Sequence, residues 1–380
     1  MKIVYFSPIM WNDLKQRPQH IAEELARTHE VSYIEPSVSL ISSIINRNHY
    51  YKKEFKIIGD NLSVYRPSGI WRLPKSLESR AIMQINTRSE RRQLHRFMED
   101  ADLFWLGSPI FEPLIGNQYR GKKIIYDKMD DYQFLTSNSL LRKVIGINEE
   151  RLVKRADSIF ISSKAFYDKI SRINPKVHLI NNGVDSDTIM CSEESKISQA
   201  IRELKKNNNT VFGYVGTIDH WFDYEIIQTI IDSDPHFHVL IVGRNNIPTK
   251  KIVSNQVHYY DPIPKKQVFD VIKHLDYGLY CFKQGDYLDT IDPVKIYEYL
   301  SCNKKIIAVS NEEIDKFGDK IIVYKTKSDV RKLLGNLTSF QSPFSTELDL
   351  NLFIQTHSWR NRVREIGNII GADEFQFNNQ

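Results

Sequence analysis

The chain has few cysteines, no long apolar run and no strong excess of charge. Its three cysteines, Cys191, Cys281 and Cys302, lie far apart without C-x-x-C spacing, so we expect buried free thiols and neither a disulfide nor metal ligands. No apolar run approaches the roughly 20 residues that a transmembrane helix needs. The first residues enter a strand pattern directly, without an export signal. These absences predict a cytoplasmic globular protein.

The small net charge of +5 is unevenly distributed. Between residues 71 and 96, only Glu78 and Glu90 accompany the cations Arg72, Lys75, Arg80, Arg88, Arg91, Arg92 and Arg96. The segment has two interpretations: a solvated helix face, or a basic helix that lies on an anionic membrane surface. We do not expect nucleic acid as a partner, because no recognised binding motif accompanies the basic segment.

The first half of the chain alternates strand and helix patterns. Strands are predicted at 2–7, 31–35, 62–66, 103–106, 123–127, 158–162 and 177–180, and helices at 17–28, 75–98, 140–155 and 165–173. An irregular aromatic and basic segment interrupts the series at 37–56. Such alternation is typical of βαβ units and therefore of a parallel sheet.

A second alternating series follows a polar segment, 186–209, that we interpret as an interdomain connection with a short helix inside it. Strands are predicted at 210–215, 237–242, 257–260, 277–282, 305–309 and 321–324, and helices at 224–231, 265–274, 328–337 and 358–370. At 380 residues the chain suits two domains. The sequence thus predicts an α/β chain with two doubly wound Rossmann-like domains, 1–185 and 210–356. The terminal segment, 357–380, is expected to cross back to the first domain, and ligands are expected in the cleft between the domains, at the carboxyl ends of the strands.

Three segments of the second domain could bind an anion. Gly216 and Thr217 follow one predicted strand, and Arg244 follows the next, so backbone amides, a hydroxyl and a guanidinium would meet at one sheet edge. Lys295 and Glu298 lie three residues apart on a short helix that follows Pro293. That pair could hold a phosphate and a sugar hydroxyl, or form only a weak surface ion pair.

These motifs occur in the same order in nucleotide-sugar glycosyltransferases of the GT-B fold, which the chain resembles over essentially its whole length. They are Gly213-Tyr214-Val215-Gly216-Thr217-Ile218 with Asp223, Val242-Gly243-Arg244, and Pro293, Lys295, Glu298, Tyr299 and Leu300 before an apolar strand. Other segments look like a subgroup that builds bacterial surface polysaccharides and is similar to teichuronic-acid and glucuronosyl transferases: Trp11 with Arg17-Pro18-Gln19-His20, residues 126–131 and Asn182-Gly183-Val184-Asp185.

The resemblance implies roles for individual residues. Glu298 would accept hydrogen bonds from the ribose hydroxyls, and Lys295 and Arg244 would neutralise the diphosphate. The backbone at Gly216 and Thr217 would approach the diphosphate, and the turn with Tyr260 and Ile263 would contact the base. No metal or cofactor is expected, because cations and helix N-termini can stabilise the leaving diphosphate. Trp11 and His20 would lie on the acceptor side.

The chain departs from the family pattern at Thr290, where many retaining members carry a second Glu. Inversion then becomes the alternative, with Asp130 as the base that deprotonates an acceptor hydroxyl. Asp127 and Asp131 are rival candidates, and Asp130 and Asp131 could instead cap the following segment. Arg17 could bind an anionic acceptor or donor group, or be a solvated residue at a helix start.

The sequence thus predicts transfer of a sugar, with uridine diphosphate as the expected carrier, to a lipid-linked glycan at the inner membrane face. Two alternatives stay open: a GT-B-like sugar-nucleotide epimerase, and a non-catalytic module that binds nucleotide or carbohydrate. An NAD-dependent oxidoreductase is disfavoured, because the G-x-G-x-x-G fingerprint is missing.

Overall fold

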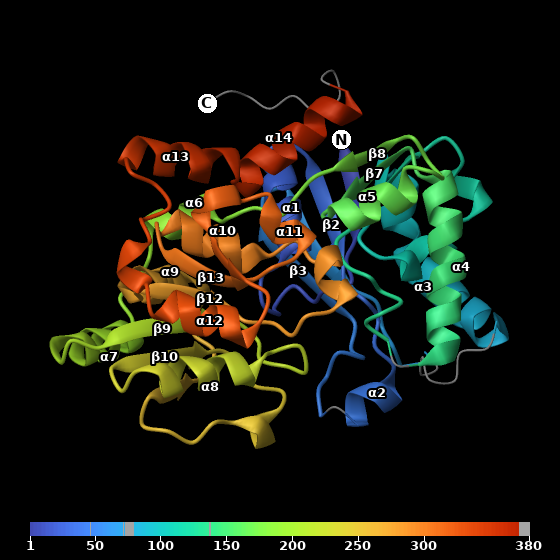
Figure 1. The fold of residues 1–380 in the computed structure, drawn as a ribbon. Helices are drawn as coiled ribbons and strands as arrows, with labels where there is room; N and C mark the ends of the chain where they lie inside the picture. Colours follow the sequence, from blue (N-terminus) through green and yellow to red (C-terminus); the bar gives the residue numbers. More distant parts are fainter. Residues whose placement is uncertain (46, 71, 73–79, 137, 372–380) are drawn as a thin grey trace. The chain divides into compact units, whose positions relative to one another are not determined.

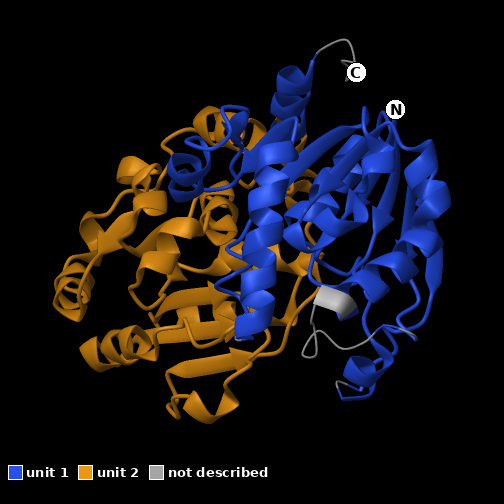
Figure 2. Cartoon of the chain, turned by 90° about the vertical axis from the view of Figure 1, so that its right-hand side faces the viewer, with its two compact units in different colours: residues 1–181, 362–380 blue, residues 182–361 orange. Residues whose placement is uncertain are grey.

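The computed structural model describes the chain except for residues 46, 71, 73–79, 137 and 372–380 (Figure 1). The chain divides into two compact units, coloured separately in Figure 2. Unit 1 comprises residues 1–181 with 362–380, and unit 2 comprises residues 182–361. Each unit has its own sheet and its own buried core.

Unit 1 contains an eight-stranded sheet with the strand order β3-β4-β2-β1-β5-β6-β7-β8. All neighbours pair in parallel except β3 and β4. The strands are β1 (Lys2–Phe6), β2 (Glu30–Ile34), β3 (Glu54–Gly59), β4 (Leu62–Arg66), β5 (Leu103–Leu106), β6 (Lys123–Lys128), β7 (Ser158–Ile161) and β8 (Val177–Leu179). The order of the chain reverses between β1 and β5, as in doubly wound sheets.

The helices of unit 1 connect these strands. They are α1 (Arg17–Ala26), α2 (Leu40–Ile45), α3 (Arg80–Asp100), α4 (Ser139–Arg155) and α5 (Lys164–Ile170), with 3-10 helices at Pro109–Leu114 and Asn117–Tyr119. Tyr5, Tyr33 and Trp105 are paired in register on adjacent strands, and their stacked ring centroids lie 5.5–5.6 Å apart. The three rings therefore share one face of the sheet and are fully buried there.

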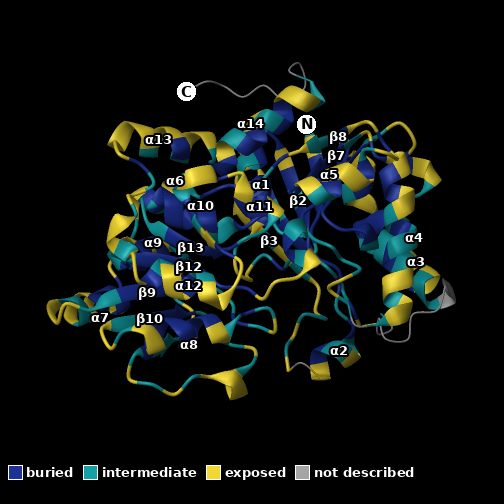
Figure 3. Ribbon diagram, viewed as in Figure 1, coloured by how far each residue is buried: buried dark blue, intermediate teal, exposed yellow. Residues whose placement is uncertain are grey.

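Unit 2 contains a six-stranded parallel sheet with the order β11-β10-β9-β12-β13-β14. The chain order of these strands reverses between β9 and β12, as in doubly wound sheets. The strands are β9 (Thr210–Val215), β10 (Phe237–Val242), β11 (Val257–Tyr260), β12 (Tyr277–Tyr280), β13 (Lys305–Val309) and β14 (Ile322–Tyr324). The central strands of both sheets are buried, whereas the edge strand β3 is largely exposed, and most other exposed residues lie on helices and loops (Figure 3).

The helices of unit 2 are α6 (Ser186–Met190), α7 (Lys196–Lys206), α8 (Tyr224–Ser233), α9 (Lys265–His274), α10 (Val294–Ser301), α11 (Glu312–Asp315), α12 (Lys327–Leu334) and α13 (Glu347–Thr356). Short 3-10 helices occur at Pro248–Lys250, Asp286–Thr290, Gly318–Lys320 and Leu337–Ser339. The last helix, α14 (Trp359–Ile370), begins in unit 2, and from residue 362 it is grouped with unit 1. None of the helices among the described residues is both long and apolar enough to cross a bilayer.

The structure differs from the sequence prediction in several places. Residues 186–209, interpreted as a connection, form α6 and α7, and Ile189, Ile197 and Ile201 belong to the core of unit 2. Polar residues dominate this segment, so its few buried positions gave a weak signal. Within 37–56, the structure adds α2 and the start of β3, and α3 begins at Arg80, with residues 75–79 of the predicted helix outside the described residues. The cysteines are free thiols, but Cys191 is exposed.

Candidate functional site

The strand-to-loop turns of unit 2 require two glycines. Gly216 directly follows β9 with φ +155°, and Gly243 directly follows β10 with φ +145°, where L residues are strained. A Cβ on Gly243 would lie 2.2 Å from the Gly216 carbonyl oxygen. A Cβ on Gly216 would lie 2.1 Å from Lys295 Cε and 2.6 Å from Lys295 Nζ. These glycines let two loops and a lysine approach closely at the carboxyl edge of the sheet.

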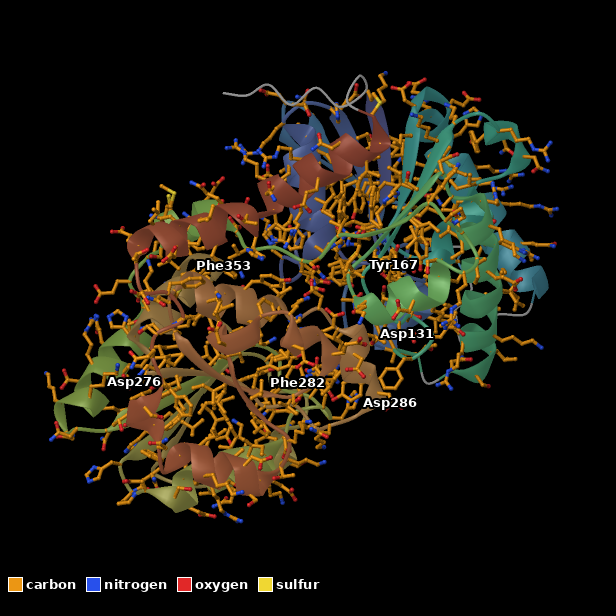
Figure 4. All side chains as sticks on the ribbon, turned by 45° about the horizontal axis from the view of Figure 1, so that its top comes forward. Asp131, Tyr167, Asp276, Phe282, Asp286 and Phe353 are labelled. Carbon is orange, nitrogen blue, oxygen red and sulfur yellow. The ribbon has the colours of Figure 1, made fainter. Side chains whose placement is uncertain are left out.

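Lys295 reaches this edge from the first turn of α10. Its Nζ lies 5.4 Å from the ring centroid of Tyr214 and 6.0 Å from that of Phe282 (labelled in Figure 4), so aromatic faces surround the ammonium. Loss of hydration lowers the pKa of Lys295, although the charge of Glu298 opposes that shift. Within the described residues, no carboxylate forms an ion pair with Lys295. The predicted alternative of a surface pair between Lys295 and Glu298 is therefore not what the structure contains.

Glu298 is buried and forms an ion pair with Lys265. Lys265 is the first residue of α9, immediately after the segment 261–264. Its ammonium also lies 5.4 Å from the Phe269 ring centroid. Sequence reasoning missed Lys265, because a lysine that starts a helix is usually solvated and nothing in the local pattern links residues 265 and 298.

Asp292 fixes the start of α10. Its side chain is fully buried and accepts hydrogen bonds from the Asn182 backbone and from the Tyr297 hydroxyl, the latter at 3.1 Å. Lys316 Nζ lies 2.5 Å from Asp292 Oδ1 and 2.7 Å from a carboxylate oxygen of Glu313. A charge with several fixed partners holds its segment rigidly, so the first turn of α10 is preorganised.

The other predicted donor-binding residues lie around the same sheet edge. Thr217 is partly exposed, and its carbonyl accepts a hydrogen bond from the Tyr214 hydroxyl at 2.7 Å. Arg244 has an exposed side chain. Tyr260 ends β11, and its carbonyl accepts a hydrogen bond from the Gly243 amide at 3.0 Å, whereas Ile263 packs against the core. Thr290 ends a 3-10 turn, and its hydroxyl bonds the Tyr287 carbonyl at 2.6 Å.

In unit 1, the loop after β6 presents Asp130 and Asp131. Asp131 accepts hydrogen bonds from the backbone amides of Gln133 and Phe134 at 3.1 and 3.2 Å, so it caps the turn. Asp130 is partly exposed, and its carboxylate has no hydrogen-bond donor among the residues that the structure describes. Burial raises the pKa of Asp130, Lys128 and Arg17 oppose the shift, and Asp131 adds to it. Asp131 is thus engaged in a turn, and Asp130 stays the candidate base of the pair.

A buried ion pair supports this loop from behind. Lys128 Nζ lies 2.6 Å from Glu149 Oε1 and donates to the Asp130 carbonyl at 3.2 Å. Tyr126 and Gln133 also donate to Glu149, at 2.7 and 3.2 Å. Burial alone would raise the pKa of Glu149, but the charge and hydrogen bond of Lys128 hold it below its ordinary value. Lys128 thus links helix α4 to the backbone of the candidate base.

Arg17 and Asp127 form an ion pair with both side chains 2% exposed. Arg17 Nε and Nη2 lie 2.9 and 2.8 Å from Asp127 Oδ1, and Nη1 donates to the Ile180 carbonyl at 2.8 Å. Trp105 and Tyr5 donate to Asp127 Oδ2 at 3.4 and 3.3 Å. Both predicted catalytic residues are therefore engaged in the interior of unit 1, so their geometry fits a structural role better than contact with substrate. Neither interpretation of Arg17 foresaw this pair, since one had its side chain bind an anionic substrate group and the other had it solvated.

The predicted acceptor-side residues lie near the carboxyl end of β1. Trp11 is half-buried, its amide donates to Glu35 at 2.7 Å, and its ring packs edge-on against Tyr33 with centroids 4.9 Å apart. His20 is buried on α1, whose start has a capping box between Gln16 and Gln19. Trp11 is therefore partly accessible, whereas His20 is largely enclosed.

The basic segment 71–96 is only partly free to meet a surface. Arg72 pairs with Glu90 and contacts Ser37, and Arg91 donates to the carbonyls of Pro113 and Leu114. Arg88, Arg92 and Arg96 are exposed. Lys75 and Glu78 lie outside the described residues.

Among the described residues, no cluster of three or more His, Cys, Asp or Glu side chains could hold a metal ion.

Comparisons with known proteins extend the resemblance. No family model matches the chain. TuaH of Bacillus subtilis (strain 168), whose own assignment as a teichuronic acid biosynthesis glycosyltransferase is provisional, is 29% identical over 238 residues. That match covers 58% of this chain and 58% of TuaH, so less than two thirds of the relative is matched.

Solved structures match almost the whole chain. Sucrose-phosphate synthase of Thermosynechococcus elongatus has a TM-score of 0.69 at 11% identity, with coverage of 97% of this chain and 98% of that chain. HepE of Anabaena, solved in complex with UDP, has a TM-score of 0.69 at 13% identity, with coverage of 98% and 100%. Such low identities establish the architecture and not the substrates. The chain therefore has the two-domain GT-B fold, and the resemblance to GT-B glycosyltransferases predicted from the sequence is confirmed.

Proposed function

We propose that the protein is a glycosyltransferase that moves a sugar from a uridine-diphosphate donor to a lipid-linked acceptor during synthesis of a bacterial surface polysaccharide. The observation that carries this proposal is Lys295, a partly dehydrated cation beside Gly216 at the doubly wound switch point of unit 2. An ammonium without a carboxylate partner is suited to a phosphate. The similarity to TuaH, and the UDP in the HepE structure, support the same donor class.

Unit 2 supplies the chemistry for the leaving group. As the bond between the anomeric carbon and the diphosphate oxygen breaks, negative charge grows on the diphosphate. Lys295 and the exposed Arg244 would neutralise that charge, so we propose that transfer needs no metal. Glu298 would accept hydrogen bonds from the ribose hydroxyls, and the backbone after Gly216 would approach the phosphates.

Unit 1 supplies the candidate base for inversion. The acceptor oxygen would attack the anomeric carbon from the face opposite the leaving diphosphate, and its proton would pass to the Asp130 carboxylate. The raised pKa of Asp130 makes it a better proton acceptor than an ordinary aspartate. Thr290, whose hydroxyl is engaged with the Tyr287 carbonyl, offers no carboxylate where many retaining relatives carry one.

A lipid-linked acceptor implies that the protein acts at the inner face of the membrane. We propose that the protein is a peripheral membrane protein and that the exposed cations of segment 71–96 contribute to binding. Three of them, Arg88, Arg92 and Arg96, face solvent on α3. Since Arg72 and Arg91 are bound within unit 1, the attraction to anionic lipid would be weaker than the sequence alone suggests.

The proposal is tested with a panel of uridine-diphosphate sugars and membrane extract as acceptor, with release of UDP and the anomeric configuration of the product as readouts. We expect Lys295→Ala and Glu298→Ala to abolish turnover. The matched controls are Lys206→Ala and Glu203→Ala, which should leave turnover intact. These residues form an exposed i,i+3 pair on α7 with 2.6 Å between the charged atoms.

Three outcomes separate the alternatives. An inverted product from acceptor and donor together supports inverting transfer, which the role proposed for Asp130 requires. Epimerised donor in the absence of acceptor would identify an epimerase. UDP binding without transfer, hydrolysis or epimerisation would identify a binding module.

A further inference from the structure

Helix α2 presents an uncovered apolar face. Ile41, Ile44 and Ile45 are 51%, 65% and 74% exposed, whereas Ser43 is buried. Figure 3 shows exposed residues on α2. Their spacing of three and four residues places the three isoleucines on one side of the helix. Branched aliphatic side chains are normally buried, so three of them together on the surface indicate an interaction site.

The segment that carries this face contains cations and no acids. Residues 36–53 contain no aspartate or glutamate, and the exposed cations Arg47, Lys52 and Lys53 follow α2; the flanking Glu54 is paired with Lys56 and Arg66. An aliphatic face next to cations complements a bilayer of anionic lipid, with the isoleucines in the acyl region and the cations at the phosphates. A protein partner of ordinary composition would offer less continuous negative charge.

The α2 segment is anchored to unit 1 by backbone hydrogen bonds. The Leu40 amide donates to the Gly69 carbonyl at 3.2 Å, and the Gly69 amide donates to the Tyr51 carbonyl at 2.8 Å. These bonds join the segment to the chain just beyond β4. Helix α2 follows β2, and the Asp130 loop follows β6, so both lie at the carboxyl edge of the same parallel sheet. In Figure 1, α2 lies at the end of unit 1 remote from the N terminus.

A second exposed apolar pair lies directly after the candidate base. Phe134 and Leu135 are 55% and 61% exposed. Asp131 caps their turn, and Arg142 donates to the carbonyls of Gln133 and Thr136 at 3.2 and 2.8 Å. The turn is therefore held in shape, and both apolar side chains are more than half exposed.

We propose that the α2 face, formed by Ile41, Ile44 and Ile45, inserts into the interfacial region of an anionic bilayer, with the Phe134–Leu135 turn as a second contact. The membrane contact itself is argued from unit 1 alone. Only the statement that the membrane supplies the lipid-linked acceptor rests on the proposed function. It places the main membrane contact on segment 37–56, not on the basic segment 71–96. Both contacts lie at the sheet edge that carries Asp130. Binding of this edge to a membrane would therefore bring a lipid-linked hydroxyl toward the Asp130 carboxylate.

The experiment measures sedimentation of the full chain with phosphatidylethanolamine–phosphatidylglycerol vesicles and, separately, with phosphatidylcholine vesicles. The test variant is the triple change Ile41→Ser, Ile44→Ser and Ile45→Ser. Its matched control, made at exposed aliphatic residues of unit 2, is Val253→Ser, Leu348→Ser and Leu352→Ser. Thermal unfolding and calorimetry with UDP are run on every variant.

We expect the wild type to bind the anionic vesicles, and the test variant to bind at least about tenfold more weakly, because three aliphatic side chains no longer leave water. The control should bind like the wild type. High salt should weaken but not abolish binding, because only the electrostatic part is screened. A second readout is Ile45→Trp, whose added emission should shift to the blue and be quenched by brominated lipid.

Two results would overturn the inference. One is vesicle binding by the triple variant equal to that of the wild type, together with an Ile45→Trp probe that stays in water. The other is a wild-type dimer in light scattering that the triple variant dissociates, without vesicle binding, because the face would then join two copies of the chain. UDP binding in either case would still support the proposed donor site. Absence of UDP binding by the wild type would count against the proposed function and not against the membrane contact.

Discussion

Gly216→Ala tests whether the approach of Lys295 to the β9 turn creates the anion site. The added Cβ would lie 2.1 Å from Lys295 Cε, whereas ordinary contact begins at 3.4 Å. The lysine must therefore withdraw by at least about 1.3 Å. Alanine must also adopt φ +155°, which costs on the order of 1–3 kcal/mol.

The displacement should weaken nucleotide binding strongly. A hydrogen bond to a charged group contributes about 1.5–3 kcal/mol, so its loss corresponds to roughly a 10- to 150-fold higher Kd for UDP. The same variant should unfold at a lower temperature, because its backbone is strained. If Gly216 acts through Lys295, the double variant Gly216→Ala, Lys295→Met should lose little more affinity than Lys295→Met alone.

Calorimetric titration with UDP measures these affinities, and thermal unfolding checks the fold. Gly335→Ala is the matched control, because this glycine has φ −71° and the nearest atom to an added Cβ is 3.6 Å away. It should bind UDP like the wild type. Wild-type affinity in a folded Gly216→Ala protein would refute the argument, as would full additivity in the double variant.

Three further perturbations test the remaining contacts. Lys128→Met removes a charge that lowers the pKa of Asp130, so the variant's Asp130 should stay protonated up to a higher pH. The acid limb of the pH profile of kcat/KM should therefore move to higher pH. A limb that does not move would exclude Asp130 as the titrating base. Lys265→Met leaves the buried Glu298 carboxylate without its ion-pair partner and should cost about 1–3 kcal/mol of unfolding free energy, measured in urea, while the exposed neighbour Lys266→Met should cost almost nothing. Asp127→Ala uncovers a buried guanidinium and should cost about 3–5 kcal/mol; lost turnover with unchanged stability would instead support a catalytic role.

The fold was largely predictable from local pattern. Strands such as β5, β9 and β10 match their predicted bounds because largely apolar runs are buried on both faces of a parallel sheet. Segments 37–56 and 186–209 were less predictable. Their regular structure depends on a few buried side chains and on backbone bonds to distant residues, such as Leu40 to Gly69.

The candidate site was predictable only where one motif carries it. Lys295 lies close to Gly216, as a glycine after a strand and a cation at a helix start suggest. The donor roles of Thr217, Arg244, Tyr260 and Ile263 stay predictions.

By itself, the sequence determined two alternating α/β series and the presence of Gly216, Lys295 and Glu298 at strand and helix ends, because periodicity and turn chemistry are local. Only the tertiary structure decided the partners of the charges. Lys265 pairs with Glu298, Lys128 with Glu149, and Arg17 with Asp127, across separations of 33, 21 and 110 residues. Such pairing depends on which side chains folding brings into a dehydrated interior, where a charge must be neutralised, and no local pattern encodes that choice.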